Sequence, residues 1–269
     1  MTGSLVCTVK LSAPLTWRAH DGGVLVGVLK AWLQPGRRWF AWFEACRDDC
    51  YEPLLAMAVG DLRSDLHASV DEADDEALAV YSRLGFEVVR REGNIVIPVG
   101  GRPAAPTGRA GRAGFPLPDG ISLISAKDAD EDRLRLLDGA LREDVPGSEG
   151  WRWDPADFRA ETYESDEFDP ATYLVAVDQA SGEYAGLVRI WMRPTAPKLG
   201  LIALLAPYRR RGLAKSMLAT ALDVVGERGL TEVVADVDEA NAASAGLLAS
   251  FGGRRDGGTV ELLRRSTGS

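Results

Sequence analysis

The sequence predicts an α/β protein with a mixed sheet, folded as two domains in tandem. Two observations support this fold class. Apolar runs of strand length alternate with segments whose apolar residues recur every three or four positions, which is the period of an amphipathic helix. A stretch rich in proline and glycine then interrupts this alternation. We expect a first domain at residues 1–97, a linker at 98–120 and a second domain at 121–269.

The second half alternates strands and helices along its whole length. Its clearest helix carries Leu134, Leu137 and Leu141 on one face. Another helix should begin after Asp154, because an aspartate cap followed by proline is a common helix start. In chain order we expect strand 121–125, helices 130–144 and 155–163, strands 172–177, 184–192 and 199–206, helix 209–228, strand 232–237, helix 242–251 and strand 260–263.

The first half begins with strands rather than helices. Two glycine-containing turns, at 21–23 and at 35–36, join three of its predicted strands into a meander. In chain order we expect strands 5–11, 15–19, 24–33 and 38–43, helix 50–62, strand 66–70 and a helix from Asp74 to a stop at Gly85.

Composition limits the class of protein. A net charge of −9 argues against nucleic-acid binding, which needs a basic face. The three cysteines and two histidines have no spacing typical of a disulfide framework or a metal site, so we expect no metal. No apolar run of about 18 residues is present, and the N-terminus lacks the features of a secretory signal. We expect a cytoplasmic protein that does not enter membranes, and its oligomeric state stays open.

One short segment points to anion binding. Residues 209–214, Arg-Arg-Arg-Gly-Leu-Ala, follow an apolar strand and open a helix. The first turn of a helix has unpaired N–H groups and a partial positive charge, so a diphosphate is stabilised there. Gly212 has no Cβ and lets the backbone approach a ligand closely. The alternative interpretation is a helix start whose basic side chains are only solvated.

A second segment follows at a characteristic distance. The predicted strand 232–237 leads into a helix that begins after Asn241 and ends at Gly252 and Gly253. Together the two segments resemble the GNAT superfamily of N-acetyltransferases. The first resembles its Arg/Gln-x-x-Gly-x-Gly/Ala pyrophosphate loop, and the second its Asn-x-x-Ala/Ser-x-x-Leu-Tyr-x-x-x-Gly-Phe segment. The resemblance covers roughly residues 120–265 and, in degraded form, part of the remainder.

This resemblance implies that acetyl-CoA is the acyl donor and that the second domain binds it. The end of strand 199–206 should hydrogen-bond the pantetheine arm through its backbone. Asn241 and Ser244 match positions that contact the arm from the other side, although Asn241 equally suits a helix N-cap. The expected cofactor-binding residues are Leu204, Leu205, Ala206, Arg209, Arg210, Arg211, Gly212, Leu213, Ala214, Lys215, Asn241 and Ser244.

The chain departs from the family at positions that carry catalysis. The family's tyrosine falls on Leu248, which has no proton to donate to a leaving thiolate. Strand 199–206 also lacks the carboxylate that many members use as a base. We therefore expect the reaction to rely on proximity and orientation of the reactants. Asp236 is the nearest carboxylate and the candidate catalytic residue, or else a solvated or capping acid.

The acceptor side is predicted only in outline. Residues 146–154 lie between the first two helices of the second domain, where the family forms part of its acceptor wall. Trp151 and Trp153 would offer an aromatic pocket, and Glu149 or Asp154 would meet an ammonium group. Equally, the tryptophans would anchor a long loop to the core. The expected partner is the amine of a small molecule.

The first domain carries a degraded copy of the same pattern. Residues 74–86 resemble the second family segment, with Asp74 in place of asparagine and with Tyr81 retained. The two halves therefore look like an internal duplication. The first is truncated, because its strands leave no room for the early helix pair. We interpret Tyr81 as a packed aromatic residue.

The first domain is not expected to bind the cofactor. At the place of the phosphate loop it has Arg47, Asp48 and Asp49, with no glycine. The two aspartates would repel a diphosphate, and no bare backbone is available for close approach.

Three functions remain open at this stage. The first is an acetyl-CoA-dependent N-acetyltransferase in which the acceptor amine attacks the thioester directly in a ternary complex. The second is a non-catalytic acyl-CoA-binding or regulatory protein, which Leu248 favours. The third is a structural protein without a cofactor, which the intact loop around Gly212 disfavours.

Overall fold

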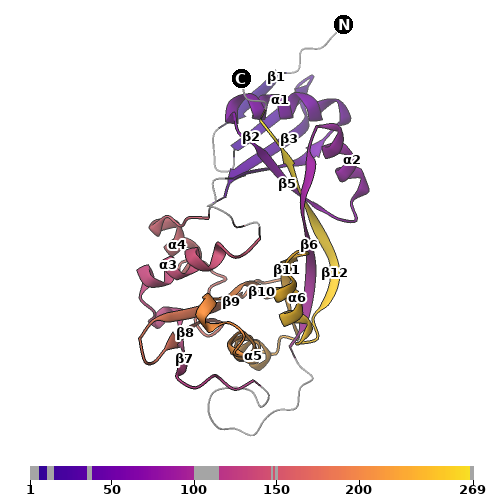
Figure 1. The fold of residues 1–269 in the computed structure, drawn as a ribbon. Helices are drawn as coiled ribbons and strands as arrows, with labels where there is room; N and C mark the ends of the chain where they lie inside the picture. The colour runs from indigo at the N-terminus through magenta and orange to yellow at the C-terminus, as the bar shows by residue number, and fades with distance from the viewer. Residues whose placement is uncertain are drawn as a thin grey trace. The chain divides into compact units, whose positions relative to one another are not determined.

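The computed structural model describes residues 6–10, 15–34, 38–99, 115–146, 148 and 151–266. It contains two compact units (Figure 1). The first comprises Met1–Glu92 and Gly257–Ser269, and the second comprises Gly93–Asp256. The chain therefore enters the second unit and returns to the first for its last strand. The domain boundaries predicted from the sequence assigned this last strand to the second domain. The linker predicted at 98–120 stays a prediction.

The second unit has a mixed sheet with helices on both faces. Its strand order is β12-β6-β11-β10-β9-β8-β7, in which β7, β8, β9 and β10 pair antiparallel and β10 pairs parallel with β11. The strands that lie wholly in this unit are β7 (Ile121–Ser125), β8 (Tyr173–Asp178), β9 (Tyr184–Trp191), β10 (Lys198–Leu204) and β11 (Glu232–Asp238). Its helices are α3 (Glu131–Arg142), α4 (Pro155–Thr162), α5 (Leu213–Glu227) and α6 (Ala242–Ala249).

Alternation along the strands builds a core on each face of this sheet. Val188 and Ile190 of β9 pack with α5, whereas Leu187 packs with α3 and α4. Figure 1 shows α5 on one side of β8 and β9 and the helix pair α3 and α4 on the other. Because both faces are covered, β9 is apolar over most of its length, as expected for a doubly buried strand.

Local signals explain where these helices begin. Asp130 accepts a hydrogen bond from the backbone N–H of Arg133 at the start of α3 (2.9 Å). Asp154 accepts one from Ala156 at the start of α4 (2.8 Å), and proline follows the cap. The predicted cap at Asp154 is confirmed. Side-chain caps of this kind satisfy N–H groups that have no partner within the helix.

The first unit is an antiparallel meander extended by a parallel pair. Its strand order is β1-β2-β3-β4-β5-β12-β6. The strands are β1 (Val6–Lys10), β2 (Leu15–Asp21), β3 (Val24–Leu33), β4 (Trp39–Cys46), β5 (Leu66–Asp71) and parts of β6 (Glu87–Pro98) and β12 (Arg254–Arg264). Its helices are α1 (Tyr51–Leu62) and α2 (Asp75–Arg83). The meander predicted from the glycine turns is confirmed by the pairing of β2 with β3 and of β3 with β4.

The two units repeat one topology. In each, an antiparallel strand leads through a helix to a parallel neighbour, as β4-α1-β5 in the first unit and β10-α5-β11 in the second. In each, a short capped helix follows and then a long strand. No helix of the described first unit lies between β1 and β2, where the second unit has α3 and α4 between β7 and β8. The predicted tandem fold with a truncated first half is therefore confirmed.

Three elements differ from the sequence prediction. Strand β6 was not predicted, and β12 begins well before residue 260. Helix α5 begins at Leu213 rather than at residue 209, because the arginines form a loop.

Both described ends of the 98–120 segment contact the second unit. Val99 donates its N–H to the carbonyl of Thr231 (2.7 Å), and Phe115 stacks on Phe251.

Candidate cofactor and acceptor site

Strand β10 pairs with β11 only where β10 begins. Their parallel register extends over Lys198 and Leu199 of β10, whereas β10 stays paired with β9 through Leu204. A register shift between Leu199 and Leu201 marks a β-bulge at Gly200. Beyond the bulge the two parallel strands diverge. This divergence frees backbone groups along one edge of β10 from strand pairing.

The end of β10 presents its backbone unevenly to that edge. Leu205 donates its N–H to the carbonyl of Ala185 (2.9 Å), so Leu205 is engaged with β9. Neighbouring residues of a strand direct their peptide groups to opposite edges, so the N–H of Leu204 points away from β9. The carbonyl of Leu204 accepts a hydrogen bond from Nε of Arg209 (2.8 Å), and that of Ala206 accepts the Arg209 N–H (3.2 Å). Leu204 is thus the residue of this group with an N–H at the diverging edge.

The loop before α5 has two residues with left-handed backbone. Arg210 has a φ of 64°, and Gly212, the N-cap of α5, has a φ of 83°. No side chain caps this helix. The N–H groups of Leu213, Ala214 and Lys215 therefore have no acceptor within the helix. A Cβ built on Gly212 would meet no atom within 4 Å, so the space beside the cap is open to a ligand. Such a row of N–H groups at a helix start is an anion site.

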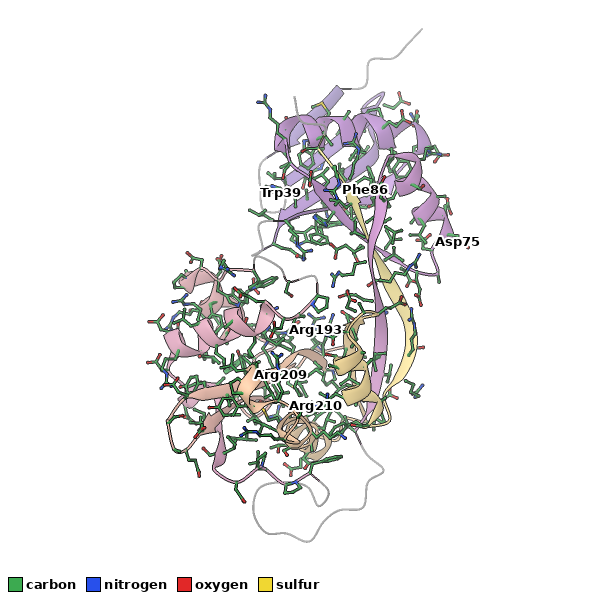
Figure 2. All side chains as sticks on the ribbon, in the orientation of Figure 1. Trp39, Asp75, Phe86, Arg193, Arg209 and Arg210 are labelled. Carbon is green, nitrogen blue, oxygen red and sulfur yellow. The ribbon has the colours of Figure 1, made fainter. Side chains whose placement is uncertain are left out.

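The three arginines of the loop differ in their contacts (Figure 2 labels Arg209 and Arg210). Arg209 is engaged within the protein, since its guanidinium pairs with Asp144 as well as with the Leu204 carbonyl. Arg210 and Arg211 are exposed. Within the described residues, Arg210 makes no hydrogen bond or ion pair. Arg210 and Arg211 are therefore the charges available to an anion in solution.

Asn241 caps α6. Its Oδ1 accepts a hydrogen bond from the N–H of Ser244 (3.0 Å), as the N-cap alternative predicted. A contact with a ligand would have to use Nδ2 of Asn241 or Oγ of Ser244. Asn241 can therefore cap the helix and contact a ligand at the same time, because the cap uses only its Oδ1.

Asp236 lies on the sheet face opposite α5. Its neighbours Ala235 and Val237 are buried in the core beneath α5, so Asp236 points the other way. Its carboxylate pairs with Nζ of Lys198, and 35% of the side chain is exposed. Asp236 is thus a partly exposed, ion-paired acid on the α3 and α4 face.

The two tryptophans of the predicted acceptor wall also lie on this face. Trp153 is buried, and its Nε1 donates to Oδ1 of Asp138 (2.6 Å). Trp151 is half-buried and meets Trp153 edge to face, with ring centroids 5.2 Å apart. Trp153 therefore anchors its loop to the core, whereas Trp151 has an exposed part. Glu149 lies outside the described residues.

Arg189 was not singled out from the sequence. It stands in the middle of β9 and is only 4% exposed, next to buried Asp138 and Tyr173. One signal was available, since Arg189 is the single charged residue in an otherwise apolar strand pattern at 184–192. A charge in a strand buried on both faces requires a partner.

Comparison with known proteins agrees with this geometry. Residues 139–252 match the acetyltransferase (GNAT) family. This match contains the diverging strands, the loop at Gly212 and the capped helix α6. This part of the chain is similar to GNAT acetyltransferases.

The whole fold also has GNAT neighbours. A GCN5-related N-acetyltransferase from Sphaerobacter thermophilus superposes with a TM-score of 0.69 at 17% identity, over 93% of this chain and 80% of the other. A tandem GNAT protein from the clavulanic acid biosynthesis pathway superposes with a TM-score of 0.66 at 16% identity, over 95% and 83%. These likenesses show the tandem GNAT fold.

The sequence relatives match only part of their length. A mycothiol acetyltransferase of Salinispora arenicola is 33% identical over 156 residues, which is 55% of this chain and 50% of the relative. One of Salinispora tropica is 34% identical over 144 residues, which is 51% and 46%. The chain thus matches about half the length of these relatives.

The GNAT tyrosine position is part of the core in this chain. Leu248 is 2% exposed and belongs to the same core cluster as Leu218 and Leu222 of α5. The leucine is therefore part of the hydrophobic core. It has no hydroxyl that could donate a proton at the diverging strands.

The first unit lacks the features of the phosphate loop at the corresponding place. Arg47 holds Asp49 through two hydrogen bonds (2.6 and 2.7 Å) and Asp21 through a third (3.0 Å), so its charge is already balanced. Tyr81 is 6% exposed and meets Phe86 edge to face, and burial raises its pKa to about 12. The interpretation of Tyr81 as a packed aromatic residue is confirmed.

Other kinds of site leave few traces in the described part of the chain. No group of three His, Cys, Asp or Glu side chains among those residues is arranged to hold a metal ion. Cys46 and Cys50 are free thiols. No helix of the described ranges is long and apolar enough to cross a membrane.

Proposed function

We propose that this protein is an acetyl-CoA-dependent N-acetyltransferase that acetylates the amine of a small molecule by direct attack in a ternary complex. The observation that carries the proposal is the uncapped N-terminus of α5, which opens beside the divergence of β10 and β11. The GNAT match of residues 139–252 supports it.

The residues present fit an acyl-CoA. The N–H groups from Gly212 to Lys215 would bind the diphosphate, and the exposed Arg210 and Arg211 would add charge. The N–H of Leu204 would meet the pantetheine arm, and Ser244 would approach it from the other side. Acetyl-CoA supplies a thioester carbonyl that an amine can attack.

The protein's own part in the reaction is mainly positional. Holding the amine and the acyl group in line replaces an encounter in solution, which alone accounts for a large part of the rate enhancement. A backbone N–H at the divergence, such as that of Leu204, would stabilise the developing oxyanion. Asp236 is a partly exposed carboxylate on the acceptor face, and its pairing with Lys198 limits it as a base.

A second function is favoured by one observation. Leu248 is buried where the family keeps a proton donor, and strand 198–204 has no carboxylate. Both features suit a protein that binds acyl-CoA without turning it over. The two functions make the same prediction for cofactor binding and differ in acetyl transfer.

Binding of acetyl-CoA should be measured by calorimetry for the wild type, Gly212→Asp and Gly229→Asp. Both glycines have left-handed backbone, and a Cβ would meet no atom within 4 Å at either position, but Gly229 follows the opposite end of α5. A negative side chain at Gly212 should weaken binding at least about 30-fold, whereas Gly229→Asp should bind like the wild type.

Acetyl transfer then separates the two functions. Release of the free CoA thiol should be followed across a panel of small amines. Amine-dependent thiol release identifies an acetyltransferase, and binding without release across the panel identifies a binding protein. If the wild type does not bind acetyl-CoA, both functions are wrong.

The acceptor class and location remain proposals. The relatives named mycothiol acetyltransferases favour a small polar amine, and the half-exposed Trp151 offers it an aromatic surface. The acidic chain suits no nucleic-acid partner. We propose a cytoplasmic location, as expected from the sequence, and make no proposal for the oligomeric state.

A further inference from the structure

A buried polar cluster lies between α3, α4 and the sheet of the second unit. Its members are each less than a tenth exposed, although they carry polar or charged groups. They are Asp138 and Arg142 of α3, Trp153, Tyr173 of β8 and Arg189 of β9.

Only one half of this cluster is satisfied by its own hydrogen bonds. Oδ1 of Asp138 accepts from Nε of Arg142 (2.6 Å) and from Nε1 of Trp153 (2.6 Å). Oδ2 of Asp138 lies 3.8 Å from Nη1 of Arg189, which is an ion pair but too long for a hydrogen bond. Asp138 therefore makes its short hydrogen bonds within α3 and with the tryptophan loop, and its interaction with Arg189 is the longer one.

Arg189 is left with unused donors. Its Nε and Nη1 are buried and have no hydrogen-bond partner among the described residues, and the same holds for the hydroxyl of Tyr173. A buried donor without a partner destabilises the folded protein, and more so when the donor is charged. Such groups are rare in folded proteins unless a ligand or water completes them.

The cluster also has an excess of positive charge. It holds two guanidinium groups and one carboxylate. Burial lowers the pKa of Arg142, Asp138 opposes that shift and Arg189 adds to it, as expected where charge is incompletely balanced. Glu161 of α4 is the nearest further carboxylate. Burial raises its pKa, and the charges of Arg189 and Arg142 oppose that rise, but Glu161 makes no hydrogen bond or ion pair with either arginine within the described residues. The donors of Arg189 therefore lack an anionic group within hydrogen-bond distance.

The unused donors lie beside the candidate reaction centre. The guanidinium of Arg189 is 4.4 Å from the ring of half-buried Trp191 and 5.6 Å from that of Tyr173. A Cβ built on Gly200 would come within 3.5 Å of Nε of Arg189. Gly200 marks the bulge at which β10 and β11 diverge. Arg189 therefore stands next to the divergence, on the face opposite α5.

We propose that Arg189 binds a carboxylate of the acceptor, so that the acceptor is a small amine that also carries a carboxylate, as amino acids do. This inference rests on the proposed function. The carboxylate accepts hydrogen bonds from Nε and Nη1 and balances the second guanidinium. Arg189 is a specificity-determining residue, and the amine, rather than the carboxylate, meets the acyl group.

The test compares matched acceptors. Acetyl transfer should be measured with the protein amino acids and with their C-terminal amides, for the wild type and for Arg189→Gln and Arg189→Lys. The wild type should prefer the free carboxylate by about tenfold or more in kcat/KM. Arg189→Gln should lose that preference through KM and keep its activity on the amides, and Arg189→Lys should keep part of it. A merely structural arginine would lower both activities together.

Arg193→Gln is the matched control. Arg193 lies two residues after β9, is exposed and pairs with Glu167 (3.1 Å), so its loss should leave the preference unchanged (Figure 2). Thermal denaturation should show whether Arg189→Gln is folded. If it is not, Arg189→Lys, which keeps the charge but not the geometry of the donors, gives the answer.

Calorimetric binding of the amino acids and amides, without acetyl-CoA, separates the two proposals. If no amine is acetylated but the wild type binds amino acids better than amides, and Arg189→Gln does not, the carboxylate site stands and the acetyltransferase fails. If amides are acetylated and bound as well as amino acids, the carboxylate site is wrong and the acetyltransferase stands. If amino acids are neither bound nor acetylated, the carboxylate site is wrong as well.

Discussion

At the scale of single residues, backbone conformation distinguishes the loop at α5 from an ordinary basic turn. Arg210 has a left-handed backbone, which costs a residue with a Cβ roughly 1 kcal/mol. Gly212 adopts the same region without that cost. Strained residues of this kind cluster at ligand sites. The exposed Arg210 is therefore strained where the diphosphate is proposed to bind.

Leu248 gives a prediction at the same scale. Leu248→Tyr restores the family's hydroxyl, but it also adds volume to a filled core. We expect a loss of about 2 kcal/mol in the free energy of unfolding, which lowers Tm by roughly 4–8 °C, with no gain in acetyl transfer. Thermal denaturation and the thiol-release assay measure both effects.

The neighbouring residue supplies the control. Leu247 is half-buried, so Leu247→Tyr should lose less stability. A Leu248→Tyr variant that melts like the wild type and transfers acetyl groups faster would show that this position faces the reaction centre instead of the core.

At the scale of elements, capping and periodicity are enough to locate most helices, whereas some strands depend on contacts with distant segments. The cap at Asp154 and the apolar spacing in α3 are local signals, and both were predictable. Strand β6 was missed, because its first residues are mostly exposed and carry four charges among Glu87, Arg90, Arg91 and Glu92. Only its strand neighbours make that segment extended.

The two helix caps Asn241 and Asp74 give a matched prediction. They occupy equivalent places in the two units, and each accepts a hydrogen bond from the residue three positions on (3.0 and 2.9 Å). Asn241→Ala and Asp74→Ala should each cost about 1 kcal/mol of stability, as measured by urea denaturation. Asn241→Ala should additionally weaken acetyl-CoA binding, and Asp74→Ala should not. Equal binding by both variants would limit Asn241 to its role as a cap.

At the scale of the whole molecule, the last strand of the sequence completes the sheet of the first unit. Residues of β12 pair with β5 from Thr259 to Arg264, and Val260 and Leu262 enter the core of the first unit. Between them, Glu261 is 5% exposed and contacts His67 (2.8 Å), Arg90 (2.8 Å) and Arg38 (3.1 Å). This buried carboxylate joins the two ends of the sequence within one unit.

Glu261 predicts how the first unit responds to acid. Burial by itself raises the pKa of Glu261, but hydrogen bonds from His67 and Arg90 and the charges of Arg90 and Arg38 lower it from 4.5 to about 2. Because the folded pKa is the lower one, the carboxylate stabilises the protein above about pH 4.5. That contribution, roughly 3 kcal/mol at pH 7, is lost as the pH falls from about 4.5 toward 2.

Glu261→Gln should therefore be less stable than the wild type at pH 7, and its stability should depend less on pH between about 4.5 and 2. Urea denaturation at several pH values measures both effects. Glu87→Gln, at an exposed position of β6, should follow the wild-type profile. A Glu261→Gln variant with the wild-type acid profile would show that other carboxylates govern unfolding in acid.

Local patterns were enough to predict the fold class, the repeated strand-helix-strand motif, the glycine-containing loop at Gly212 and the absence of such a loop at Arg47. Each of these depends on residues within one turn or one strand, where spacing and side-chain type decide the outcome. Tertiary structure decided the rest: the burial of Leu248, the pairing of Asp236 with Lys198 and the unused donors of Arg189. It also decided which unit receives β12. Burial and ion pairing depend on contacts between distant segments, such as the 223 positions that separate Arg38 from Glu261, and no local pattern records them.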